Sequence, residues 1–187
     1  MLSHTKVCVC DNTLGDSLYD VLYKVERIED AKHLSLNFRA KDGPSVGLLI
    51  VQLDEETKNE YEQCIELSRV LSIVMPFVVY LELNLPVTPL KLFDQCDVLT
   101  TLVLSRGKVV LPSLCCLKTL HVGLVDDLTF NGVYPQLTKV EAESEVVLID
   151  REVSRTVIEF VQMFNPGTCL ENKIHVCFPN ARVTYLH

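Results

Sequence analysis

The chain has 187 residues, of which 48% are hydrophobic and 22% are charged. These proportions are those of a globular protein and exclude a disordered, collagen-like or low-complexity chain. Lys and Arg number 17 against 25 Asp and Glu, which gives a net charge of −8; because no window holds a dense basic cluster to contact phosphates, nucleic acid is not an expected partner.

The first third of the chain is expected to contain two amphipathic helices with a short strand between them. Asp16 to Asp30 places its apolar residues on one side of a helix. Asp54 to Val74 does the same, with acidic residues at its start and Pro76 beyond its end. Between these helices, Ala31 to Leu36 reads Ala-Lys-His-Leu-Ser-Leu and is predicted as a strand, and Lys41 to Ser45 is predicted as a turn.

A repeat runs through the middle of the chain. Four segments share an apolar pivot residue, with an apolar residue three positions before it and another two positions after it. The pivots are Leu81, Leu102, Leu120 and Val140, which recur at a nearly constant interval, and the longer interval from Leu34 to Leu81 leaves room for two rungs. Each pivot is predicted to lie in a short strand, and the strands to stack into a solenoid, because one unit alone cannot bury its apolar side.

This pattern matches the leucine-rich repeat, L-x-x-L-x-L-x-x-N/C-x-L, except at the Asn/Cys position. That position is occupied by Pro86, Gly107, Val125 and Glu145, so the array is expected to be irregular. We therefore predict an α/β fold: an irregular leucine-rich-repeat solenoid with short parallel strands and flanking helices, in which residues 1–187 form a single domain. A plain α/β domain is the alternative, because short apolar strands also produce alternating leucines.

The C-terminal part is expected to contain one more helix and the closing strands. Arg151 to Phe164 has apolar residues at helical spacing and ends at an Asn-Pro-Gly sequence. Lys173 to Phe178 and Arg182 to Leu186 are predicted as strands.

Two segments carry a family resemblance. Leu90 to Ser105 combines a Leu-Phe pair, Cys96 and a Leu-x-x-Leu-x-Leu-Ser run, and Val110 to Val122 continues with Leu-Pro-x-Leu and then Leu-Lys-x-Leu. These segments resemble the leucine-rich-repeat region of plant F-box proteins. The resemblance implies a non-catalytic subunit that recruits substrates to a cullin-type ubiquitin ligase. Nothing in Met1 to Asp30 is similar to an F-box, so either the chain is a repeat domain without an F-box or the likeness is only to the fold.

The residues between the buried leucines of a solenoid strand point to its concave face, where solenoids usually bind partners. The expected partner-binding residues are Tyr80, Glu82, Asn84, Thr101, Val103, Thr119, His121, Lys139, Glu141 and Glu143, and the wider face adds His33, Ser35, Asn37, Ser105, Gly123 and His175. The alternative is a set of plainly solvated strand residues. Because Glu82, Glu141 and Glu143 share the predicted face, we expect a protein partner with a basic surface.

The eight cysteines raise the alternative of a thiol- or metal-dependent enzyme. Cys8 and Cys10 lie on one side of a predicted strand near His4, but a structural zinc needs four ligands, and the adjacent Cys115 and Cys116 would point to opposite sides of a strand. No carboxylate is fixed by spacing beside the histidines of the predicted face, which are His33, His121 and His175. We therefore predict no catalytic residue, no metal and no cofactor; a structural subunit of a larger assembly is a further alternative.

The chain shows no sequence signal for export or for membrane insertion. Met1 to Lys6 is polar, and the longest apolar stretch, Val70 to Leu85, is interrupted by Pro76 and by polar residues. We expect a soluble protein with reduced thiols in the cytoplasm, with the nucleus as the alternative. The oligomeric state is left open.

Overall fold

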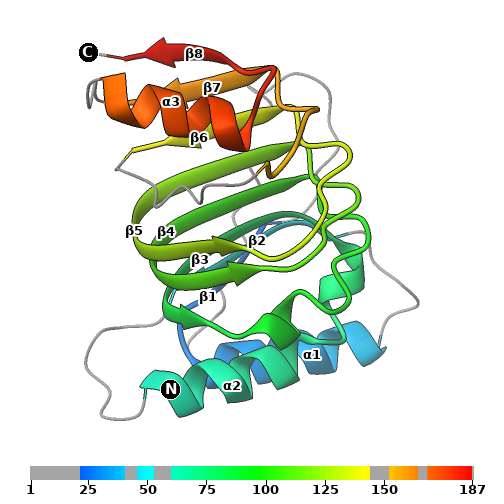
Figure 1. The fold of residues 1–187 in the computed structure, drawn as a ribbon. Helices are drawn as coiled ribbons and strands as arrows, with labels where there is room; N and C mark the ends of the chain where they lie inside the picture. The colour runs from blue at the N-terminus through cyan, green and yellow to red at the C-terminus, as the bar shows by residue number, and fades with distance from the viewer. Residues whose placement is uncertain (1–21, 41–45, 53–59, 144–151, 164–167, 187) are drawn as a thin grey trace.

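The computed structural model describes residues 22–40, 46–52, 60–143, 152–163 and 168–186 (Figure 1). Its elements in chain order are β1 (Leu22–Val25), α1 (Ile28–Ala40), β2 (Val46–Gln52), α2 (Glu60–Leu71), the 3-10 helix η1 (Met75–Phe77), β3 (Val78–Thr88), the 3-10 helix η2 (Leu90–Leu92), β4 (Thr101–Leu111), β5 (Thr119–Phe130), β6 (Lys139–Ala142), β7 (Glu159–Gln162), α3 (Thr168–Cys177) and β8 (Arg182–Tyr185).

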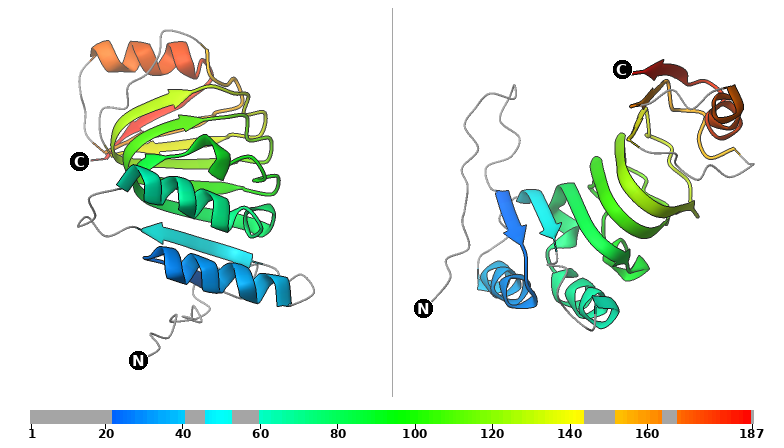
Figure 2. Two further views of the ribbon diagram at one scale, coloured as in Figure 1. Left: turned by 90° about the horizontal axis from the view of Figure 1, so that it is seen from below. Right: turned by 90° about the vertical axis from the view of Figure 1, so that its left-hand side faces the viewer.

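The eight strands form one parallel sheet in the order β1 to β8, so each strand lies beside the strands that precede and follow it in the chain. Every connection returns to the same end of the sheet before the next strand begins, and the chain winds as a solenoid, as predicted. Figure 2 shows that the sheet is curved and that α1, α2 and α3 lie on its outer side. We call the inner side of the sheet, which these helices leave uncovered, the open face.

The length of each coil decides what forms its outer layer. Tyr23, Leu49 and Leu81 are equivalent positions of β1, β2 and β3, and the two long coils between them hold α1 and α2. The four coils that follow, from Leu81 to Phe160, are markedly shorter and leave no room for a helix and two crossings. Their outer layer is formed by loops, by η2 and by the second halves of β3, β4 and β5. The last coil, from Phe160 to Val183, is slightly longer again and holds α3.

The predicted pivots form a ladder across the sheet. Leu81 pairs with Leu102, Leu102 with Leu120 and Leu120 with Val140, so the alignment of these four segments is confirmed. Phe160 pairs with Val140 and extends the ladder by one further rung. All five side chains are at most 1% exposed, and burial of each contributes roughly 1.5–3 kcal/mol to folding.

A bulge at Gly107 turns β4 from the sheet toward the outer layer. Gly107 has a φ of 86°, and the pairing of β4 with β5 shifts register between Gly107 and Lys108. A Cβ atom at this position would lie 2.1 Å from the carbonyl oxygen of Leu85. The repeat position where a leucine-rich repeat has Asn or Cys therefore carries, in this coil, the residue that lets two backbones approach.

The prediction of a strand from Ala31 to Leu36 is wrong, because this segment lies inside α1. Ala31, Leu34 and Ser35 are buried, which is the spacing of a helix and not the alternation of a strand. The helix begins where Asp30 accepts a hydrogen bond from the backbone N–H of Arg27, at 3.1 Å. Leu34 is thus a core residue of α1 and not a rung of the ladder.

Of the two predicted N-terminal helices, the first was placed too early and the second is confirmed in part. The predicted helix from Asp16 to Asp30 is replaced by β1 and the first turn of α1 over its described part, and residues 16–21 lie outside the described residues, as does the turn at 41–45. The helix predicted from Asp54 to Val74 is confirmed over Glu60–Leu71; residues 54–59 are not described, and residues 72–74 form a turn.

At the C-terminal end, the predicted helix and one predicted strand exchange places. The described part of Arg151 to Phe164 holds β7 instead of the expected helix, because Phe160 is needed in the ladder beside Val140. Lys173 to Phe178 belongs mostly to α3, where Ile174, Cys177 and Phe178 are buried at helical spacing. The strand predicted at Arg182 to Leu186 is confirmed as β8.

Candidate functional site

The open face presents parallel rows of side chains that cross the strands. Two of these rows follow the strand register, Tyr80–Thr101–Thr119–Lys139–Glu159–Arg182 and Glu82–Val103–His121–Glu141–Val161–Thr184. The structure therefore brings eight of the ten predicted contact residues into two adjacent rows. Of the other two, Glu143 is exposed just beyond β6, and Asn84 on β3 has a buried Oδ1 with no hydrogen-bond partner among the described residues.

The histidines predicted to share this face do not meet. His33 lies on α1 together with Ser35 and Asn37, and His175 lies on α3. Both helices are on the outer side of the sheet, so only His121 remains on the open face (Figure 2). The prediction is wrong because Ala31–Leu36 lies in a helix and Lys173–Phe178 lies mostly in one, whereas both segments were predicted as strands.

A small ion-pair network links three strands on the open face. His121 Nδ1 of β5 contacts Glu141 Oε2 of β6, and Lys139 Nζ lies 2.6 Å from Glu141 Oε1 and 3.8 Å from Glu159 Oε2 of β7. The hydrogen bond to Glu141 raises the pKa of Lys139 above its ordinary value. Glu141 is therefore already paired with two basic side chains, whereas Glu82 and Glu143 have no ion pair with another described residue.

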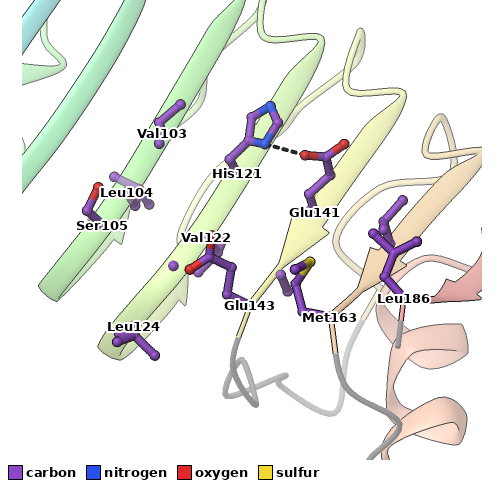
Figure 3. Close-up of a pocket in the computed structure, with 13 residues that line it drawn as sticks. Val103, Leu104, Ser105, His121, Val122, Leu124, Glu141, Glu143, Met163 and Leu186 are labelled. Atoms are coloured by element: carbon purple, nitrogen blue, oxygen red, sulfur yellow. Dashed lines mark ion pairs between the residues drawn. The ribbon is translucent and has the colours of Figure 1, made fainter.

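Beside this network lies a shallow pocket of about 240 Å³ (Figure 3). Its walls combine His121 and Glu141 of the network, together with the neighbouring Glu143, with apolar side chains from β4, β5, β6 and β7 and from the residues that directly follow β7 and β8. The lining residues are Val103, Leu104, Ser105, His121, Val122, Gly123, Leu124, Glu141, Ala142, Glu143, Val161, Met163 and Leu186.

Gly123, which has no side chain, is one of the residues that line the pocket. Ser105 precedes it on β4, and Glu143 and Met163 follow it on the C-terminal side, so a row of side chains has a gap at this point. A Cβ atom at Gly123 would lie 3.1 Å from the backbone oxygen of Ser105, which shows how closely β4 and β5 approach under the gap.

Three apolar residues of the pocket were not predicted from the sequence. Leu124, Met163 and Leu186 are 72%, 41% and 46% exposed. Met163 was missed because its segment was predicted as a helix, although the regular interval between pivots, continued from Val140 to Phe160, would have placed it. Leu124 follows the point where β5 leaves strict alternation, so no simple pattern could have placed it.

The described residues offer little material for metal or thiol chemistry. They contain no group of three or more His, Cys, Asp or Glu side chains that could hold a metal ion. Burial raises the pKa of the Cys96 thiol to about 12, so this thiol stays protonated and a poor nucleophile at neutral pH. Cys115 is exposed beside the half-buried Cys116, and His4, Cys8 and Cys10, which the sequence analysis considered as zinc ligands and did not favour, lie outside the described residues.

No helix in the part of the chain that the structure describes has both the length and the apolar character that a membrane crossing requires. Comparison with known proteins adds no further assignment: no family model, no curated protein and no solved structure matches the chain.

Proposed function

We propose that this protein is a non-catalytic interaction module that binds another protein through the open face of its solenoid. The observation that carries the proposal is the open face itself, where two registered rows of half-exposed side chains lie next to three exposed apolar residues. A sheet face that the helices leave open can contact a partner over several coils at once, which is how solenoid proteins bind. The pocket within it is smaller than the roughly 300–1,000 Å³ of small-molecule sites.

We further propose that the solenoid is a divergent member of the leucine-rich-repeat class. The ladder of Leu81, Leu102 and Leu120 supports this proposal, as do the short coils and the parallel strands. The solenoid departs from the leucine-rich-repeat pattern in two ways: it lacks the Asn ladder, and the outer layer of its middle coils includes the second halves of β3, β4 and β5. The resemblance of Leu90–Ser105 and Val110–Val122 to plant F-box proteins adds a narrower proposal, recruitment of a substrate to a ubiquitin ligase.

Two carboxylates of the open face that have no ion pair with another described residue, Glu82 and Glu143, favour a partner with a basic surface. Glu82 is half-buried on β3, and Glu143 is exposed just beyond β6. Glu141 adds less to the net charge than its position suggests, since Lys139 and His121 already face it. Long-range attraction to a basic partner would raise the association rate at low ionic strength.

Site-specific photo-crosslinking tests the proposal. A photoreactive amino acid is placed at Thr101, on the open face, and separately at Lys91, which is exposed in η2 on the outer side. In native extract, we expect the Thr101 probe to crosslink a discrete protein that the Lys91 probe does not reach. Cullin-ligase subunits or their substrates among the crosslinked proteins would support the narrower proposal.

A matched pair of charge reversals completes the test. Glu82→Lys on the open face should weaken capture of the crosslinked partner by roughly tenfold, a cost of about 1.4 kcal/mol. Glu62→Lys, an exposed position on α2, should leave capture unchanged. Crosslinks that come only from Lys91 would place the contact on the outer layer. Equal effects of both reversals would show that capture does not depend specifically on the open face. Either result would contradict the proposal.

A further inference from the structure

We propose that the pocket around Gly123 receives a single apolar side chain of an extended partner segment, and that this segment carries a Lys or Arg next to the apolar residue. The inference rests on the proposed function and deepens it, because it names the chemistry of the segment that the open face selects. It is argued from the shape, the lining and the charge of the pocket.

The apolar part of the pocket includes three side chains that are exposed to solvent. Leu124, Met163 and Leu186 are all exposed, and they come from three separated parts of the chain that the sheet brings around one hollow (Figure 3). Val103 and Val161 add apolar lining from the adjacent row, and Leu104, Val122 and Ala142 also line the pocket. Exposed apolar side chains that converge from several strands, with polar residues around them, mark contact sites more often than isolated ones do.

The size of the hollow selects the occupant. Its volume of about 240 Å³ suits one aliphatic or aromatic side chain, and its floor at Gly123 is backbone. A rigid sheet floor with an adaptable methionine on one wall is a good receptor for an anchor residue, because methionine fills irregular gaps without fixed geometry. A helix of about 10 Å diameter would stand above the hollow and reach it with one residue, whereas an extended segment can follow the rows of the sheet.

The charge at the rim selects the neighbouring residue. Glu143 is exposed at the pocket, and no ion pair joins it to another described residue. Glu141 lies beside it, with its two oxygens directed at His121 and Lys139. A Lys or Arg of the bound segment would therefore meet Glu143 first. The same acidic rim disfavours a phosphate-bearing ligand.

The test begins with a peptide selection in which the full chain is the bait. A display library of random dodecapeptides is selected in parallel on the native chain, on Glu143→Lys and on Leu124→Ser. We expect the native chain to enrich peptides with one Leu, Ile, Met or Phe and a nearby Lys or Arg. Glu143→Lys should exchange the basic residue for Asp or Glu, and Leu124→Ser should remove the enrichment of the apolar residue.

Binding of the best synthetic peptide is then measured by fluorescence polarisation. Leu124→Ser and Met163→Ser should each weaken binding by roughly tenfold or more. Val133→Ser is the matched control, since Val133 is 63% exposed but lies in the loop between β5 and β6, outside the lining of this pocket. Its affinity should equal that of the native chain.

Methyl NMR locates the peptide and verifies the fold in the same experiment. The chain has three methionines, Met1, Met75 and Met163. On peptide addition, the ¹³C-methyl signal of Met163 should shift, while that of Met75, which is 1% exposed in the core, should stay in place. An unchanged Met75 signal in each variant shows that the variant is folded.

Three outcomes overturn the pocket proposal. They are a selection that enriches no peptide specific to the native chain, a consensus without an apolar anchor, and a Met163 signal that does not respond to a bound peptide. If crosslinking from Thr101 and loss of binding in Glu82→Lys persist in any of these cases, the open face still binds a partner and only the pocket assignment fails. If those are lost as well, both proposals fail.

Discussion

Gly107 is the residue at which the short coils depend most on backbone freedom. Its φ of 86° is a conformation that side-chain-bearing residues rarely adopt, and a Cβ atom would meet the backbone oxygens of Leu85 and Pro86 at 2.1 and 2.4 Å. Both obstacles are backbone atoms of the neighbouring coil, so no side-chain rotation can relieve the clash.

We therefore expect Gly107→Ala to lower the free energy of unfolding by roughly 2–4 kcal/mol, the sum of the conformational strain and the forced displacement of β3. Urea unfolding followed by circular dichroism measures this value. The control is Gly123→Ala, where the nearest obstacle lies at 3.1 Å and φ is not in the left-handed region; its loss should be about 1 kcal/mol or less. Equal losses would show that the bulge does not constrain the fold.

At the candidate site, alternation along the predicted strands found charged and polar residues of the open face on β3 to β6, but not Glu159 on β7 or Arg182 on β8. It placed Glu82, His121 and Glu141 in one row, which the strand register confirms. It could not find the pocket, because a hollow depends on which side chains are absent as well as on which are present. Gly123 was expected on the wider face, but only the positions of Leu124 and Met163 around it give the gap its meaning.

A hydrogen bond that the sequence does not predict joins helices α1 and α2. Ser35 Oγ donates to the carbonyl oxygen of Val70 at 2.6 Å, and Ser35 is 7% exposed. Val70 lies in the last turn of α2, where carbonyl groups have no donor within the helix. Ser35 thus stabilises the end of one helix from the buried side of the other.

Replacement of this serine should weaken the contact between the two helices. We expect Ser35→Ala to reduce the free energy of unfolding by about 1–2 kcal/mol, because the half-buried carbonyl loses a hydrogen bond. Ser72→Ala is the matched control: its hydroxyl donates to the carbonyl oxygen of Arg69 at 2.9 Å, but in an exposed place where water can replace it. Chemical unfolding measures the free energy of unfolding of both variants, and an equal decrease in the two would contradict this account.

The helices show why the ladder could be predicted and the outer layer could not. Each pivot sits in a run with strand alternation and recurs at a nearly constant interval, so two independent signals agreed at Leu81, Leu102, Leu120 and Val140. The segment Ala31–Leu36 has the same Leu-x-Leu run, but its buried residues follow helical spacing, and the stretch from there to Leu81 holds helical coils of unequal length. The local pattern was ambiguous there, and coil length decided the structure.

For the molecule as a whole, stability is expected to be built coil by coil. The elements contact mainly their neighbours in the chain, as in other solenoids. At the C-terminal end, α3 is attached through an aromatic cluster in which Phe178 faces Phe130 and Phe160, with ring centroids 6.0 and 5.7 Å apart. Tyr134 joins this cluster beside Phe130, and its hydroxyl donates to the carbonyl oxygen of Leu111 at 2.7 Å.

Loss of the Phe178 ring, which contacts the other two phenylalanines, should therefore destabilise only the C-terminal end of the solenoid. Phe178→Ala is expected to cost about 3–5 kcal/mol and to increase amide hydrogen exchange in β7, α3 and β8, while β2, α2 and β3 keep their protection. Leu67→Ala, a fully buried position on α2, should give the reverse distribution. Hydrogen exchange measured by mass spectrometry distinguishes the two ends, and uniform loss of protection in either variant would show that the coils unfold as one unit.

The coils differ in length, yet their pivots share one register across the sheet. Residues gained or lost in the outer layer change the length of a single coil, but they leave Val103, His121 and Glu141 aligned on the open face. Insertions and deletions in the outer layer can thus accumulate while the open face keeps its rows of side chains, so the two sides of the solenoid are free to evolve almost independently.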